Sequence, residues 1–278
     1  GDGSGLTGVA GTENIRTNTN ATFLQNINVG VAITAGKLGI GFTDTNIKIG
    51  STALDSLTTG ANNTAVGHNA LTANTTGNDN TAVGKDALLS NTTGQYNAAL
   101  GIGALDANTT GDYNVGLGNY SLSGNTTGDN NTGIGYGALF SNTTADNNTA
   151  VGKNSLLQNT TGTKCVAVGS AALDANTTGD SNTAIGYVSL SANTIGYQNT
   201  AVGEQSLNLN TTGNRNTAIG FESLEDNTTG HYNTGLGYGS LASNTTADYN
   251  VAIGYETLKV NTTGTRNIAI GAEALDAS

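Results

Sequence analysis

The chain has 278 residues, of which only 10% are charged, and it contains 41 glycines but no proline, methionine or tryptophan. This composition differs from that of an ordinary globular domain and indicates a repeat protein. The formal net charge is −11, with nine lysines and arginines in total. That balance argues against nucleic acid and anionic membranes as partners. No apolar stretch approaches the roughly 20 residues that span a bilayer, so we expect no membrane insertion by this segment.

The first 45 residues do not repeat, and we expect them to form a lead-in or a cap. From residue 46 to 278, a glycine preceded by Ile, Val or Leu recurs every seventeen positions. Leucine stands four residues after each of these anchor glycines, and the consensus reads N-T-A-I-G-Y-x-S-L-x-x-N-T-T-G-x-x. The anchor glycines are Gly50, Gly67, Gly84, Gly101, Gly118, Gly135, Gly152, Gly169, Gly186, Gly203, Gly220, Gly237, Gly254 and Gly271.

This unit predicts an all-β fold, a parallel β-solenoid or β-roll with one rung per repeat. It is rich in glycine and β-branched residues and lacks a helical apolar stripe. The T-A-I-G run is the expected strand, and N-T-T-G is the expected corner. About fourteen rungs stacked 4.7 to 4.9 Å apart would give a rod on the order of 65 Å long.

Stacking would place equivalent residues in columns along the rod. We expect the aliphatic column, which precedes the anchor glycines, and the leucine column, which follows them, to form the core. Two asparagine columns lie four residues before and seven residues after the anchor glycines, and we expect their side-chain amides to hydrogen-bond as ladders. We expect three of these columns to be structural ladders. After the first rung they begin with the glycines Gly67 and Gly84, the leucines Leu71 and Leu88, and the asparagines Asn74, Asn91 and Asn108.

Between threonine and the aliphatic residue of each strand lies a small-residue column, which is Ala or Gly in every rung except at Lys48. Strand alternation places this column on the face opposite the threonine and aliphatic residues. A column of small residues is typical of a close approach to another surface. We therefore expect self-association, in the simplest case as a homotrimer about an axis parallel to the solenoid.

The strand motif resembles the head-domain repeats of trimeric autotransporter adhesins. N-T-A-V-G-K-D-A at residues 80–87 and N-T-A-I-G-Y-V-S at residues 182–189 carry the resemblance, which covers residues 46–278. Here each rung has three more residues than the fourteen-residue adhesin unit. Related Asn-Thr-Gly-rich repeats also resemble segments of phage tail fibres and other virion fibres. The resemblance implies a left-handed, trimeric, extracellular β-roll.

The sequence offers no catalytic, cofactor or metal site, so we expect a non-enzyme without cofactors. His68 and His231 occupy different rung positions, and Cys165 stands where other rungs have asparagine. Glu222 and Glu256 share a column, which is too weak a pattern for a polysaccharide-degrading enzyme. Acidic residues after the corner glycine raise calcium binding as an alternative, but the G-G-x-G-x-D signature is absent. These are Asp112, Asp129 and Asp180, and also Asp146 and Asp248, where alanine replaces the glycine.

Four tyrosines follow an anchor glycine, namely Tyr136, Tyr187, Tyr238 and Tyr255. Four more stand directly before the asparagines of the strand column, namely Tyr96, Tyr113, Tyr232 and Tyr249. Exposed tyrosines can stack on sugars, although packing between rungs or subunits is an equal alternative. The sequence therefore predicts a structural fibre segment on a virion or cell surface. It would serve as a spacer and in attachment to a host glycan or protein receptor. The alternatives are a trimeric autotransporter adhesin head and an ice-binding solenoid.

Overall fold

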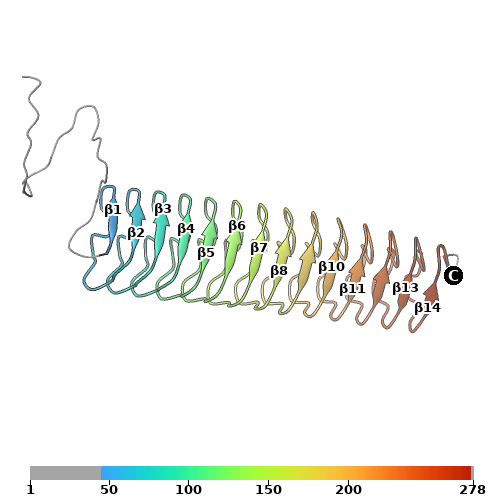
Figure 1. Ribbon diagram of the computed structural model, residues 1–278. Helices are drawn as coiled ribbons and strands as arrows, with labels where there is room; N and C mark the ends of the chain where they lie inside the picture. Colours follow the sequence, from blue (N-terminus) through green and yellow to red (C-terminus); the bar gives the residue numbers. More distant parts are fainter. Residues whose placement is uncertain (1–44, 277–278) are drawn as a thin grey trace, which may run out of the picture. The chain divides into compact units, whose positions relative to one another are not determined.

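A computed structural model describes residues 45–276, and the expected lead-in of residues 1–45 lies outside the described residues except at its last position. The described chain forms one sheet of fourteen parallel strands, each paired with the next along the sequence (Figure 1). Ile47 pairs with Thr64 in register, and the same seventeen-residue offset relates every later pair of strands. The predicted parallel β-solenoid of seventeen-residue rungs is confirmed.

Every strand has three residues. The strands are β1 (Ile47–Ile49), β2 (Thr64–Val66), β3 (Thr81–Val83), β4 (Ala98–Leu100), β5 (Val115–Leu117), β6 (Thr132–Ile134), β7 (Thr149–Val151), β8 (Val166–Val168), β9 (Thr183–Ile185), β10 (Thr200–Val202), β11 (Thr217–Ile219), β12 (Thr234–Leu236), β13 (Val251–Ile253) and β14 (Ile268–Ile270). Within residues 45–276, the structure has no helix long and apolar enough to cross a bilayer.

The anchor glycine directly follows each strand, and its φ lies between 122° and 140°. This region is essentially closed to residues with a Cβ atom. From Gly50 to Gly254, a Cβ on the anchor glycine would lie 2.3–2.6 Å from the carbonyl oxygen of the next anchor glycine. Backbone conformation and rung-to-rung contact therefore both require glycine in this column.

The leucine column forms the core, although its backbone conformation is unusual. Its φ values run from 49° to 55°, in the left-handed region that leucine rarely adopts. Twelve of these leucines, from Leu71 to Leu258, are fully buried. Burial of a leucine side chain contributes about 1.5–3 kcal/mol, which offsets a left-handed penalty of about 1–2 kcal/mol.

The aliphatic column does not belong to the core, so that part of the sequence prediction is wrong. Leu100 is 53% exposed and Ile185 is 40% exposed, whereas Ala99 and Ala184 between the outward residues are buried. The interior between strand and leucine column is too narrow for a large side chain. Even a Cβ on Gly116 would lie 3.0 Å from the Ser121 hydroxyl.

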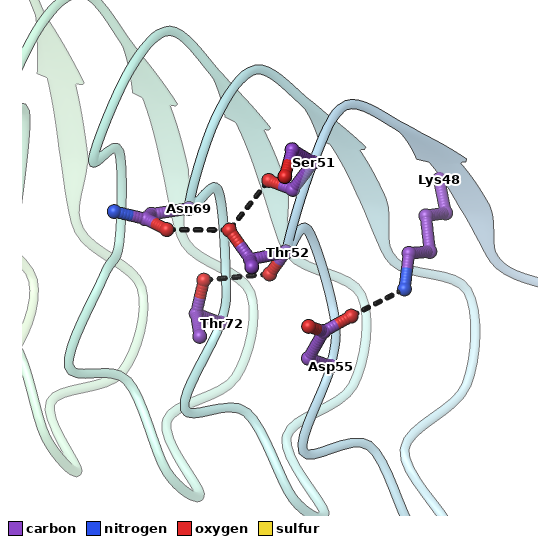
Figure 2. Close-up of polar contacts among 6 residues, drawn as sticks. All are labelled: Lys48, Ser51, Thr52, Asp55, Asn69 and Thr72. Atoms are coloured by element: carbon purple, nitrogen blue, oxygen red, sulfur yellow. Dashed lines mark hydrogen bonds and ion pairs between the residues drawn. The ribbon is translucent and has the colours of Figure 1, made fainter.

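The small-residue column therefore approaches the interior of its own chain rather than another surface. This observation removes the argument from that column for a trimer. The exception, Lys48, lies in the first described strand, where its ammonium group pairs with the Asp55 carboxylate at 2.6 Å (Figure 2). The Lys48 side chain is 32% exposed, so the charge at this position reaches solvent.

Polar side chains outside the core also link the first rungs (Figure 2). Thr52 donates to the Asn69 side-chain oxygen in the next rung and contacts the carbonyl of Ser51. Thr72 donates back to the Thr52 carbonyl at 2.7 Å. Contacts of this kind hold neighbouring rungs together without any contribution from the core.

Candidate interaction surfaces

The corner asparagine column, seven residues after the anchor glycines, forms an amide ladder inside the rod. From Asn91 to Asn244, each Nδ2 donates to the Oδ1 of the preceding asparagine at 2.8–3.0 Å. The same Nδ2 also donates to a carbonyl three residues ahead, as in Asn91 to Gly94 at 3.0 Å. Because both amide hydrogens are used and the side chains are buried, the Asn-Thr-Thr triplets cannot carry glycans in the folded protein.

The strand asparagine column, four residues before the anchor glycines, bonds mainly to backbone rather than to other amides. The Oδ1 of Asn114 accepts the backbone N–H of Asn131 at 2.9 Å, and the Nδ2 of Asn114 donates to the Gly128 carbonyl at 2.8 Å. This column therefore satisfies the backbone where the corner meets the strand. Both asparagine columns are structural and offer no free group to a ligand.

Cys165 is the one departure from asparagine in that column from β1 to β14. Its thiol is buried and donates to the Gly179 carbonyl at 3.3 Å. Burial raises the pKa of the thiol to about 11, and the nearby Asp180 carboxylate contributes to the rise. A neutral buried thiol is a poor nucleophile, which gives Cys165 a packing role.

Restoring asparagine at this position is expected to stabilise the protein by about 1 kcal/mol, because Asn would replace weak sulfur hydrogen bonds with amide ones. The stability that depends on the neutral thiol is complete below the ordinary thiol pKa of 9.0 and is lost as the pH rises towards about 11. Urea unfolding of Cys165→Asn and the parent at pH 7 and pH 10.5 measures both effects. A stability difference that does not grow with pH would contradict this account.

The outward residues of the strands form a continuous surface, the threonine–aliphatic face, which comprises the first and third residues of every strand. From β2 to β13 these residues are Thr, Val, Ala, Ile and Leu, and none of them is charged. Their exposure is substantial, with Ile134 at 37% and Leu236 at 41%. In a chain of net charge −11, this face is a long, neutral and partly apolar strip.

Two of the four tyrosines predicted for recognition belong to an aromatic stack. The Tyr238 ring lies between Phe221, at a centroid distance of 5.5 Å, and Tyr255, at 5.2 Å. Both faces of Tyr238 are therefore covered by neighbouring rungs. Tyr187 is 56% exposed, and Tyr136 meets Tyr120 edge-on at 6.1 Å. Tyr136 and Tyr187 lie outside this stack, and Tyr255 ends it with one face against Tyr238, so of the four tyrosines Tyr238 alone is covered on both faces.

A second aromatic column lies just before the strands, at the position where the sequence places Tyr96, Tyr113, Tyr232 and Tyr249. The Tyr232 and Tyr249 rings stack at 4.8 Å, and the stack is covered at its ends by the guanidinium groups of Arg215 and Arg266 at 5.3 and 5.5 Å. These four residues follow one another at the repeat spacing, which identifies the tyrosines from the sequence and would also have identified the two arginines. The stacking and cation–π contacts of this column link four successive rungs.

Two of the remaining polar candidates, His231 and Glu256, are engaged in structural contacts. His231 accepts the backbone N–H of Asn214 at 2.9 Å, and Glu256 pairs with Lys259 at 2.5 Å. Burial raises the pKa of Glu225, and the neighbouring carboxylates of Glu222 and Asp226 raise it further. The described residues contain no group of three or more His, Cys, Asp or Glu side chains that could hold a metal ion.

The aspartates after the corner glycine have a structural explanation as well. Each accepts a backbone N–H from the preceding rung at 2.7 Å, as Asp129 does from Asp112 and Asp248 does from His231. The same bond is made by Asp112, Asp146 and Asp180. The position therefore favours a short side chain with an oxygen acceptor.

Comparison with protein-family models, curated proteins and solved structures finds no match to this chain.

Proposed function

We propose that this chain is a structural fibre segment of a virion or cell surface, which acts as a spacer rod and in attachment. The observation that carries the proposal is the threonine–aliphatic face, which runs along the whole rod. A monomeric protein rarely exposes an apolar strip of this length without a partner for it. Both asparagine columns of the described rod are already engaged in hydrogen bonds between rungs.

The partner that fits this face best is a second and third copy of the same chain. The strip is straight and uncharged and repeats at every rung, so parallel copies would match it along its full length. Net negative charge on each copy disfavours association elsewhere on the surface but not at a neutral strip. In a homotrimer, the outward Ile, Val and Leu side chains would form a second apolar core between the chains.

The mass in solution tests this proposal. Analytical ultracentrifugation at micromolar concentration is expected to give three times the chain mass of 27.7 kDa. Ile185→Glu places a charge in the middle of the face and is expected to yield monomers. Leu209 lies off the face and is 44% exposed, against 40% for Ile185. Leu209→Glu is therefore the matched control and is expected to leave the trimer intact. A monomeric parent protein would overturn the trimer.

An ice-binding solenoid would use the same face, because its outward threonines form a regular array. The two uses exclude each other, since a trimer covers the face. Non-threonine residues interrupt the array at Ala98, Val115, Val166 and Val251. We therefore expect the purified protein to show no thermal hysteresis. The alternative function for the same trimeric rod is the head of an adhesin. Binding of the purified protein to candidate host cells tests attachment separately from the trimer.

A further inference from the structure

A hollow of about 370 Å³ lies on the loop that follows β6 and extends over the equivalent loop of the next rung. Its apolar walls come from Tyr136, Phe140 and Leu157, and its polar groups come from Ser141, Asn154 and Gln158. Tyr136 is 55% exposed and Phe140 is 42% exposed, so solvent reaches both rings. Neither an acidic nor a basic side chain is among the lining residues.

Gly137 lies at the base of this hollow, where an added Cβ would meet the Asn154 side-chain oxygen at 2.9 Å rather than an aromatic ring. The equivalent position in other rungs carries a larger side chain, such as Asn69 or Glu222. Glycine recurs at this position in two other rungs. Over Gly103, the Tyr120 ring lies 3.0 Å from where a Cβ would stand, so an aromatic ring fills the space. Gly239 follows a tyrosine as Gly137 does, but its loop has Ala242 where the hollow has Phe140.

The hollow is therefore the one place from β2 to β14 where a glycine at this position lies between a tyrosine and a phenylalanine of the same loop. Tyr120 meets Tyr136 edge-on, at an interplanar angle of 86°, and braces the wall from the preceding rung. The Phe140 backbone N–H donates to the Gly137 carbonyl at 3.3 Å, which fixes the loop beneath the opening. The walls are thus supported before any ligand arrives.

We propose that this hollow binds a neutral pyranose sugar, and this assignment rests on the attachment role proposed above. Aromatic walls pack against the C–H faces of a sugar ring, while amide and hydroxyl side chains hydrogen-bond its hydroxyl groups. The volume is at the low end for small-molecule sites, which fits one monosaccharide unit of a surface glycan. The uncharged lining gives no counterion for a carboxylate or an amine on the ligand.

None of the lining residues belongs to the threonine–aliphatic face. A trimer joined through that face would therefore carry three such hollows, one on each chain. Three weak sites on one rigid rod can act together on a surface that displays many copies of the same sugar. Weak affinity at each hollow is compatible with firm attachment of the assembled fibre.

Saturation-transfer NMR on the intact protein tests the assignment with methyl glucoside, methyl galactoside and N-acetylglucosamine as probes. At least one of these is expected to bind with a dissociation constant on the order of 1 mM, as suits a small ligand. Gly137→Asn fills the hollow with a residue that Asn154 shows to be accepted at the next equivalent position, where its φ is 58°. That variant is expected to weaken binding at least about tenfold, as is Phe140→Ala.

Gly239→Asn is the matched control, because it makes the same change in a rung without the second aromatic wall, and it is expected to bind as the parent does. Binding that survives in Gly137→Asn would overturn the assignment, as would the absence of any sugar signal in the parent. Equal binding of cyclohexanol would overturn it too, since that outcome means unspecific apolar contact. A parent protein that is trimeric and binds cells but gives no sugar signal would refute this site alone and leave the proposed fibre role standing.

Discussion

Replacing Gly152 by alanine is expected to destabilise the protein by about 3 kcal/mol or more, because the added Cβ causes both backbone strain and a steric clash. Gly152 has a φ of 134°, which alanine cannot adopt without strain. Its added Cβ would also lie 2.5 Å from the Gly169 carbonyl oxygen. The Cβ is fixed to the backbone of one rung and the atoms that it meets are backbone atoms of the next, so relief requires the rungs to separate and to lose the hydrogen bonds between them.

Gly239→Ala is the matched control for this substitution. Gly239 has a φ of 57°, and the nearest atom to its added Cβ would be the side-chain Cγ of Glu256 at 3.4 Å. Ala171 already occupies the equivalent position in another rung, with a φ of 54°. We expect a change of about 1 kcal/mol or less. Urea unfolding followed by circular dichroism compares the two variants, and equal midpoints would contradict the explanation of the anchor glycines.

The repeat made the fold predictable, because period, strand position and corner can all be read from spacing. Which strand face turns inward could not be read in the same way. Alternation separates Ala184 from Thr183 and Ile185 but does not say which side is the interior. Hydrophobicity favoured the isoleucine, and the structure places the alanine inside because the coil is narrow. A core built on leucine needs only a small residue opposite it.

The candidate sites depend on contacts between residues of neighbouring rungs. These contacts can be predicted from the sequence only when residues at the repeat spacing are compared with one another. Tyr238 and Tyr136 occupy the same position in their rungs. The first is covered by stacked rings on both faces, while the second borders an open hollow. The difference comes from neighbours at the repeat spacing, such as Phe221 beside Tyr238. The residues next to each tyrosine in the sequence therefore do not reveal whether its ring is covered or open.

Replacing Asn125 by alanine is expected to destabilise the protein by about 2–5 kcal/mol, because it leaves buried polar groups without partners. Asn125 donates to the Asn108 oxygen at 2.9 Å and accepts from the Asn142 amide at 2.8 Å. Neither group can turn to water, since both side chains are fully buried. The Gly128 carbonyl loses one donor but keeps the Asn114 amide at 2.8 Å, so it adds less to the cost.

Thr127→Ala changes an exposed side chain in the same corner and is expected to alter stability by less than about 0.5 kcal/mol. Asn125→Asp separates hydrogen bonding from volume, because it keeps the shape but removes both amide donors. Burial would raise the pKa of the new carboxyl group, so this variant should be most stable at acidic pH and lose stability as the pH rises through that pKa. Urea titrations at pH 4 and pH 8 measure the difference. If Asn125→Asp were as stable as the parent at pH 8, the column would be held together by packing alone, and the amide ladder would contribute nothing to the rod.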